Sequence, residues 1–204
     1  RAGWGRLTRL LTLGNRRAKK GECEIGLRDL LANLEDLLLI LVPPDQLTGL
    51  EEVLTRMAEA APGAVWLGVA LHRRGDDRRR LARLKAMADR ACVPLLALND
   101  VLYAAPDDRD LQDVLTCIRE GATIETAGRR LEANAERWLK PVEEMARLFK
   151  DAPEAVAETT AFLARATFDL SDLKYEYPEE PVPPGETPQG WLEELVRRRT
   201  LLRY

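Results

Sequence analysis

Short apolar runs alternate with amphipathic stretches in the first hundred residues. Three runs have the length of strands and are apolar at successive positions: residues 37–42, 64–71 and 94–98. Between them, residues 47–58 and 81–91 repeat apolar side chains at helical spacing. Strands that are apolar on both faces and are separated by helices of this length are typical of parallel βαβ units. The pattern therefore predicts an α/β domain, built as a doubly wound sheet or as a barrel.

Helical spacing continues on both sides of this alternating region. Upstream, it predicts two short helices, over residues 4–14 and 27–34. Downstream of Asp100 it predicts helices only. The first of these carries an apolar stripe of four side chains: Leu111, Val114, Leu115 and Ile118. Pro141 and Pro153 fit the first turns of two more helices, where a missing N–H has no cost.

The last part of the chain differs in composition. Five prolines between residues 169 and 188 predict an extended linker, which a final helix over residues 191–203 follows. We therefore expect two parts. They are residues 1–168, divided into a parallel α/β portion (1–104) and a helical portion (105–168), and residues 169–204.

Composition narrows the class of protein. The chain has 204 residues, 46% apolar and 32% charged, which excludes a disordered protein. Its net charge of −3 excludes a uniformly basic nucleic-acid coat, and one histidine with three cysteines offers too few ligands for a self-contained zinc site. No apolar run approaches the roughly 18 residues that span a membrane. Cys23, Cys92 and Cys117 lack CxxC spacing, which favours a reducing cytoplasm.

The first residue of the chain and the distribution of its charges both suggest a segment of a longer protein. Residue 1 is Arg1 and the first methionine is Met57, so we expect an excised segment, with a processed chain as the alternative. Residues 73–90 hold eight basic and three acidic side chains, whereas residues 150–194 hold three basic and eleven acidic. Such polarity suits a domain between nucleic acid and other protein parts, although a solvated face is the commoner cause.

Two polar positions follow predicted strands. His72 ends the second run and Asp100 follows the third, where α/β proteins place their chemistry, so they could be metal ligands or an acid–base pair. In the simpler interpretation, which we favour, His72 lies on the surface and Asp76 or Asp77 caps the next helix. Asn99 and Asp100 then close a turn. We therefore assign no catalytic, cofactor-binding or metal-binding residue to this chain.

Basic residues form three groups that could contact phosphate, because arginine can bind it through two hydrogen bonds. The groups are Arg16, Arg17, Lys19 and Lys20; Arg73, Arg74, Arg78, Arg79, Arg80 and Arg83; and Arg197, Arg198 and Arg199. The middle group lies on a helix with an apolar opposite face, so we favour a solvated outer face over a DNA track. No Walker A loop, GxGxxG turn, GxSxG elbow or HExxH helix is present, and the segment alone does not look catalytic.

Four phrases of the sequence resemble, in the same order, one known family. They are PLLALNDVLY (94–103), LQDVLTCIREG (111–121), the stretch 135–149 and the connector 175–188. Together they are similar to the PHP domain of bacterial C-family DNA polymerases, the replicative alpha subunits and their relatives. The phrase KGEC (20–23) and the arginine-rich run over 73–84 look most like the error-prone, translesion branch.

The resemblance implies a partial PHP-type distorted α/β barrel, followed by a helical segment, an extended linker and the first palm helix. The opening barrel strands, with most of the family's metal-binding histidines, would lie before Arg1. The palm carboxylates that hold Mg²⁺ would lie beyond Tyr204. At the family's Asp-x-His metal motif this sequence keeps Asp100 but has Leu102, which offers no lone pair to a metal.

The function implied is that of a fragment of an error-prone DNA polymerase, with this segment acting as a scaffold without its own active site. The expected partners are primer–template DNA, other polymerase domains and accessory translesion proteins, with no membrane. One alternative is a PHP-type metal-dependent phosphoesterase or proofreading nuclease. Another is a module of the polymerase assembly that binds protein and not DNA.

Overall fold

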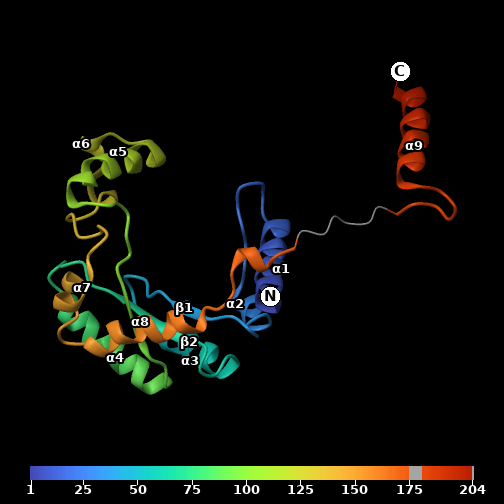
Figure 1. The fold of residues 1–204 in the computed structure, drawn as a ribbon. Helices are drawn as coiled ribbons and strands as arrows, with labels where there is room; N and C mark the ends of the chain where they lie inside the picture. The colour runs from blue at the N-terminus through green and yellow to red at the C-terminus, as the bar shows by residue number, and fades with distance from the viewer. Residues whose placement is uncertain (175–180, 204) are drawn as a thin grey trace. The chain divides into compact units, whose positions relative to one another are not determined.

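The computed structural model describes residues 1–174 and 181–203. It divides the chain into two compact units, Arg1–Thr167 and Phe168–Tyr204. The first unit contains the sheet and most of the helices (Figure 1). Among the described residues, no helix combines the length and the apolar character that crossing a membrane requires.

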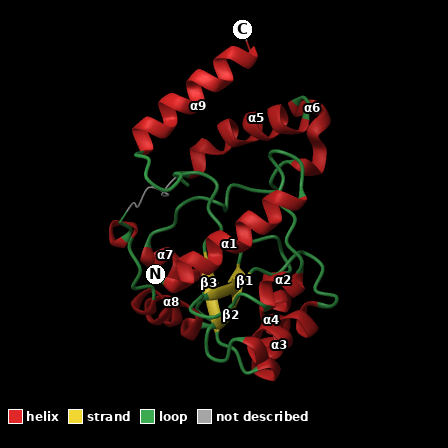
Figure 2. Cartoon of the chain, turned by 90° about the vertical axis from the view of Figure 1, so that its right-hand side faces the viewer, coloured by secondary structure: helices red, strands yellow, loops and turns green. Residues whose placement is uncertain are grey.

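Three parallel strands form the centre of the first unit (Figure 2). In the order of the sheet they are β1 (Leu39–Leu41), β2 (Val65–Ala70) and β3 (Leu95–Leu98). Their connections run through α3 (Leu50–Ala60) and α4 (Asp77–Ala91). The predicted parallel βαβ units are therefore confirmed, and the strands are shorter than the apolar runs that predicted them.

The central strand β2 is buried on both faces. Its side chains alternate in direction, so Leu67 and Val69 face the main core with Leu54 of α3 and Leu84 of α4. Trp66 points to the other face and is also buried. Full burial of such an aliphatic or aromatic side chain contributes roughly 1.5–3 kcal/mol, so this strand anchors the unit.

Helix α8 (Pro153–Arg165) packs against the edge strand β3. Its Glu158 accepts a hydrogen bond of 2.8 Å from the indole Nε1 of Trp66, and the ring of Phe162 meets that indole edge-on at a centroid distance of 4.9 Å. In the sequence, Val156, Thr160 and Leu163 of this helix repeat at helical spacing, but Leu163 is 71% exposed. Phe162, its neighbour in the sequence, faces Trp66 instead and packs an aromatic ring against the indole.

The N-terminal helix α1 (Ala2–Arg17) is longer than expected. Gly14 does not end it, because the glycine is helical and faces the loop that follows. A Cβ atom at this position would lie 2.6 Å from the sulfur of Cys23, so the glycine permits a close approach of helix and loop. The next helix, α2 (Leu27–Leu31), is shorter than the predicted residues 27–34.

Helix α5 (Arg109–Glu120) has the predicted apolar stripe, but the stripe does not face the core. Its four side chains are between 45% and 72% exposed, and the buried residues of the helix are Thr116 and Cys117. The remaining α-helices are α6 (Ile124–Ala127), α7 (Val142–Leu148) and, in the second unit, α9 (Pro188–Arg203). Single 3₁₀ turns are η1 (Pro106–Asp108), η2 (Gly128–Arg130) and η3 (Leu170–Asp172). Pro141 lies just before the first turn of α7 and not in it, whereas Pro153 starts α8 as predicted.

The mixed α/β class is confirmed. Within the described residues the sheet has three strands and stays open, so a barrel remains a prediction about a longer polypeptide.

Stability should depend on the buried leucines and not on the stripe of α5. We expect Leu54→Ala to lower the free energy of unfolding by about 2–5 kcal/mol, because Leu54 is fully buried between β2 and its helices. The matched change Leu111→Ala should stay within about 0.5 kcal/mol, since that side chain is exposed. Urea unfolding followed by circular dichroism measures both. Equal losses would mean that the stripe of α5 is packed in solution.

Candidate functional site

The carboxyl ends of β2 and β3 bring His72 and Asp100 together. Because the two strands are adjacent and parallel, the residues that follow them lie side by side. The imidazole Nε2 of His72 is 3.6 Å from the Oδ2 of Asp100. Arg73 and Asp100 both have left-handed backbone, with φ values of 51° and 49°. Such a conformation is costly for a non-glycine residue and persists only where surrounding contacts hold it.

His72 is not the surface histidine that the sequence suggested. Its side chain is only 13% exposed, and this burial lowers the pKa of the imidazole. The carboxylate of Asp100 acts in the opposite direction, while the guanidinium groups of Arg74 and Arg137 lower the pKa further. At 3.6 Å, the contact with Asp100 is longer than a hydrogen bond. The geometry therefore favours a neutral imidazole.

Arg137 is the central residue of the site, although no pattern in the sequence pointed to it. Its guanidinium donates hydrogen bonds to the Oδ1 and the backbone carbonyl of Asp100, at 2.8 and 3.0 Å, and to the Oε1 of Glu132 at 2.6 Å. The two carboxylates raise the pKa of Arg137 against the opposing effect of burial. Nothing in the local sequence marks this arginine, because its partner Asp100 lies 37 residues earlier.

Further ion pairs extend the network on both sides. Arg74 binds Glu132 at 2.9 Å, and Arg73 binds Glu144 at 2.6 Å. Burial raises the pKa of Glu132, but Arg137 and Arg74 outweigh it and hold the pKa below its usual range. Acids and bases therefore balance at these strand ends, and the acids are largely neutralised by arginine.

Residues 132–140 cross the carboxyl ends of β2 and β3 and bind the residues that follow these strands. The Asn134 side chain donates to the carbonyl of His72 at 2.7 Å. The backbone N–H of Leu102 donates to the carbonyl of Arg137 at 2.7 Å, and that of Leu139 donates to Tyr103 at 3.0 Å. These bonds hold the segment after β3 in place. The predicted turn at Asn99 and Asp100 is not formed: no backbone hydrogen bond closes one there, and the distant residues 132–140 hold this segment instead.

A metal ion implied by the PHP resemblance does not fit these residues. Asp100 is bound by Arg137, and Leu102 supplies no donor atom. In residues 1–174 and 181–203, no three histidine, cysteine, aspartate or glutamate side chains group in a way that could hold a metal ion. The prediction that Asp76 or Asp77 caps α4 with its side chain is wrong. Asp76 precedes the helix without a side-chain cap, and the Oδ2 of Asp77 accepts from the backbone N–H of Arg73, before the helix, at 2.6 Å.

The middle basic group is mostly engaged within the protein. Arg73 and Arg74 belong to the network described above, and Arg80 donates to the backbone carbonyls of Pro43, Pro44 and Asp45. Arg80 thus ties α4 to the loop after β1. Five of its six arginines are exposed, which agrees with the predicted solvated face. Arg73, Arg74 and Arg80 also bind carboxylates and carbonyls, which uses donors that phosphate would need.

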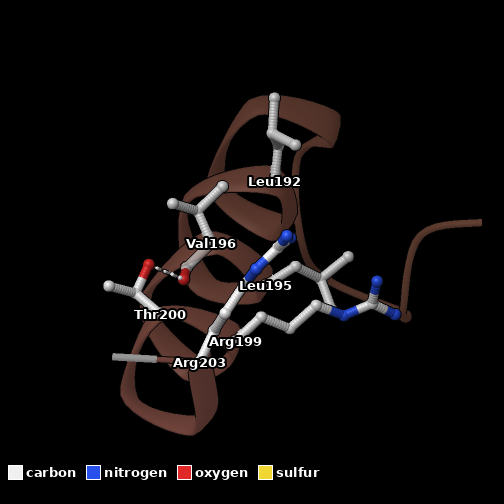
Figure 3. A pocket seen from close by; sticks show the side chains of 6 residues that line it. All are labelled: Leu192, Leu195, Val196, Arg199, Thr200 and Arg203. Carbon is white, nitrogen blue, oxygen red and sulfur yellow. Dashed lines mark hydrogen bonds between the residues drawn. The ribbon is translucent and has the colours of Figure 1, made fainter.

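The second unit offers a surface pocket on one face of α9 (Figure 3). It is lined by Leu192, Leu195, Val196, Arg199, Thr200 and Arg203. Thr200 donates its hydroxyl to the carbonyl of Val196 at 2.8 Å, an ordinary bond within a helix. The lining combines apolar side chains with two arginines and has no acid or nucleophile paired with a base.

Comparisons with known proteins identify the relatives of the chain. It is 54% identical over 203 residues to an error-prone DNA polymerase of a Bradyrhizobium species. The aligned region covers 96% of this chain and 17% of that polymerase. The error-prone DNA polymerase of Rhodopseudomonas palustris is also 54% identical, and that of Caulobacter vibrioides is 47% identical over the whole of this chain. This chain is homologous to a segment of the error-prone DNA polymerases. It spans about a fifth of the length of these curated polymerases, and no family model matches it.

The pKa of His72 should lie below the usual value of about 6.5. The unfolded chain then binds a proton that the native chain does not, so the free energy of unfolding falls as the pH drops from about 6.5 towards the native pKa. The chain has one histidine, so its ring proton can be titrated by NMR without assignment. His72→Gln should remove this part of the pH dependence. A measured pKa above 6.5 would instead indicate an imidazolium paired with Asp100.

Loss of Arg137 should release residues 132–140 from the carboxyl ends of the strands. We expect Arg137→Met to lower the free energy of unfolding by about 1–3 kcal/mol, because Asp100 loses its charged hydrogen bonds. Denaturant unfolding measures the change, and amide hydrogen exchange at Leu102 should become faster. The control Arg119→Met removes an exposed arginine of α5 and should leave both readings unchanged. An unchanged stability of Arg137→Met would show that the network contributes nothing to folding.

Proposed function

We propose that this chain is part of an error-prone DNA polymerase and braces neighbouring parts of that protein without reactive groups of its own. Similarity to such polymerases over 96% of the chain supports the first statement. The network around Arg137 supports the second. Asp100 and Glu132 are engaged by guanidinium groups, so they are poor candidates for holding a metal ion or accepting a proton.

The longer protein would transfer nucleotides to a primer on a DNA template during translesion synthesis and DNA repair. Magnesium would be held by carboxylates outside this segment. Residues 1–168 would form the later part of a PHP-type barrel, and residues 169–204 the linker and first palm helix. The partners would be primer–template DNA, other polymerase domains and accessory translesion proteins, and the location would be the cytoplasm.

A second candidate is a module that binds protein within the polymerase assembly. The exposed apolar stripe of α5 favours it, because four large apolar side chains on one helix face are expensive to leave in water. The two candidates are compatible, since a bracing segment must itself contact other parts of the protein. A phosphoesterase or proofreading nuclease is the less favoured alternative, because Arg137 binds the carboxylates of Asp100 and Glu132 at the strand ends.

Activity assays test the absence of a reactive site. The 204-residue chain should neither extend a primer nor hydrolyse a phosphodiester when magnesium, manganese or zinc is added. The full-length relative, which is 54% identical over this segment, should extend a primer under the same conditions with magnesium. Radiolabelled primer extension and a chromogenic phosphodiester measure both reactions.

The variant Asp100→Ala distinguishes the remaining possibilities. Metal-dependent hydrolysis that is lost in this variant would establish a phosphoesterase site at the strand ends. Hydrolysis that survives it would place a reactive site elsewhere in the chain. Either result would contradict a purely bracing role, and a full-length relative that cannot extend a primer would contradict the polymerase proposal.

A further inference from the structure

Uncompensated positive charge is concentrated at the start of the chain. Residues 1–20 carry seven basic side chains and no acid, although the whole chain has a net charge of −3. Two of the seven are neutralised: Arg6 binds Glu35 and Asp36, and Arg17 binds Asp29 at 2.5 Å. We define the N-terminal basic patch as four of the others: Arg9, Arg16, Lys19 and Lys20.

All four members of the patch are exposed. In residues 1–174 and 181–203, none of their side chains takes part in a hydrogen bond or ion pair. The middle basic group differs, because most of its arginines are bound to carboxylates or carbonyls. In the third group, Arg197 and Arg198 pair with Glu194. In the first group, the side chains of Arg16, Lys19 and Lys20 have no partner within the described residues, and only Arg17 is paired.

The shape of α1 aligns the patch. Arg9 and Arg16 are seven residues apart, nearly two helical turns, so they share a face and lie about 10 Å apart along the axis. That face is opposite the one buried through Gly3, Leu10 and Gly14. Lys19 and Lys20 follow directly after the end of the helix, in the loop drawn in blue beside α1 in Figure 1. Arg9 and Arg16 thus form a line along one side of the helix, and Lys19 and Lys20 follow its end in the loop.

Stabilisation of the helix explains only part of this arrangement. Cations in the last turn interact favourably with the helix dipole, which accounts for Arg16. Arg9 lies in the middle of the helix, and Lys19 and Lys20 lie beyond it, so the dipole does not account for them. Gly5 also lies on the exposed face, and a Cβ atom there would meet nothing within 4 Å. A glycine weakens a helix, and here no packing requires it, but it lets another backbone approach closely.

We propose that the N-terminal basic patch binds the phosphate backbone of duplex DNA. The proposal rests on the proposed function, since primer–template DNA is the polyanion that an error-prone polymerase holds. Duplex DNA carries a phosphate every 3.4 Å or so along each strand, and a row of cations over a few helical turns matches such a line of charge. The patch contains no aromatic side chain, so it contacts the backbone and does not read or stack on bases.

Salt dependence of DNA binding tests the patch. Fluorescence anisotropy of a labelled duplex is measured with the 204-residue chain between 50 and 200 mM salt. Four phosphate contacts predict a slope of log K against log salt of about −3.6, or roughly a hundredfold loss of affinity over this range. The fourfold variant Arg9→Gln, Arg16→Gln, Lys19→Gln, Lys20→Gln should weaken binding at 50 mM salt at least tenfold and bring the slope close to zero.

A charge-matched control separates the patch from net charge. The variant Arg56→Gln, Arg79→Gln, Arg83→Gln, Lys150→Gln removes four other exposed cations, and it should keep the affinity and the slope of the unsubstituted chain. Circular dichroism confirms that both variants are folded.

Three results would overturn the proposal: no binding at 50 mM salt, equal losses in both variants, or patch-dependent binding to phosphatidylserine vesicles without binding to DNA. Anisotropy reports binding and not synthesis. These results would therefore leave the polymerase proposal standing, which primer extension by the full-length relative tests separately.

Discussion

Burial of the central strand on both faces is the constraint on which the first unit depends. Strand β2 can exclude water from both faces only if helices pack against it and strands pair with both of its edges. Helices α3 and α4 supply one set of contacts, and Phe162 and Glu158 of α8 reach Trp66. Parallel pairing then follows from helical connections, which return each strand in the same direction.

Parallel pairing also places charged residues close together. All three strands end at one edge of the sheet, so the polar residues that follow β2 and β3 must share a small and partly buried space. Without compensation, the carboxylate of Asp100 would be costly there. Arg137 supplies that compensation, and the same bonds hold the crossing segment 132–140 over the edge. The segment that neutralises Asp100 is therefore also the segment that covers the strand ends.

The basic side chains form two sets: one binds acids and carbonyls of the chain itself, and the other is left exposed to solvent. Arginines near the sheet are used to bind carboxylates and carbonyls of the chain itself, as Arg80 shows for the loop after β1. Arginines and lysines along α1 mostly have no such partners. Composition alone treats the two sets as equivalent, since both are runs of basic residues. Their difference depends on which acids and carbonyls the fold brings within reach.

The sequence by itself determined the elements that depend on local pattern. The three apolar runs became strands and the amphipathic stretches between them became helices, because periodicity reflects which faces must be buried. The phrases that resemble C-family polymerases also pointed to the relatives that the comparisons identified. Only the tertiary structure decided which side chains found a partner: the stripe of α5 is exposed, Phe162 and not Leu163 packs on Trp66, and the side chain of His72 is largely shielded from water. It alone paired Asp100 with Arg137, since residues far apart in the sequence meet only when the whole chain has folded.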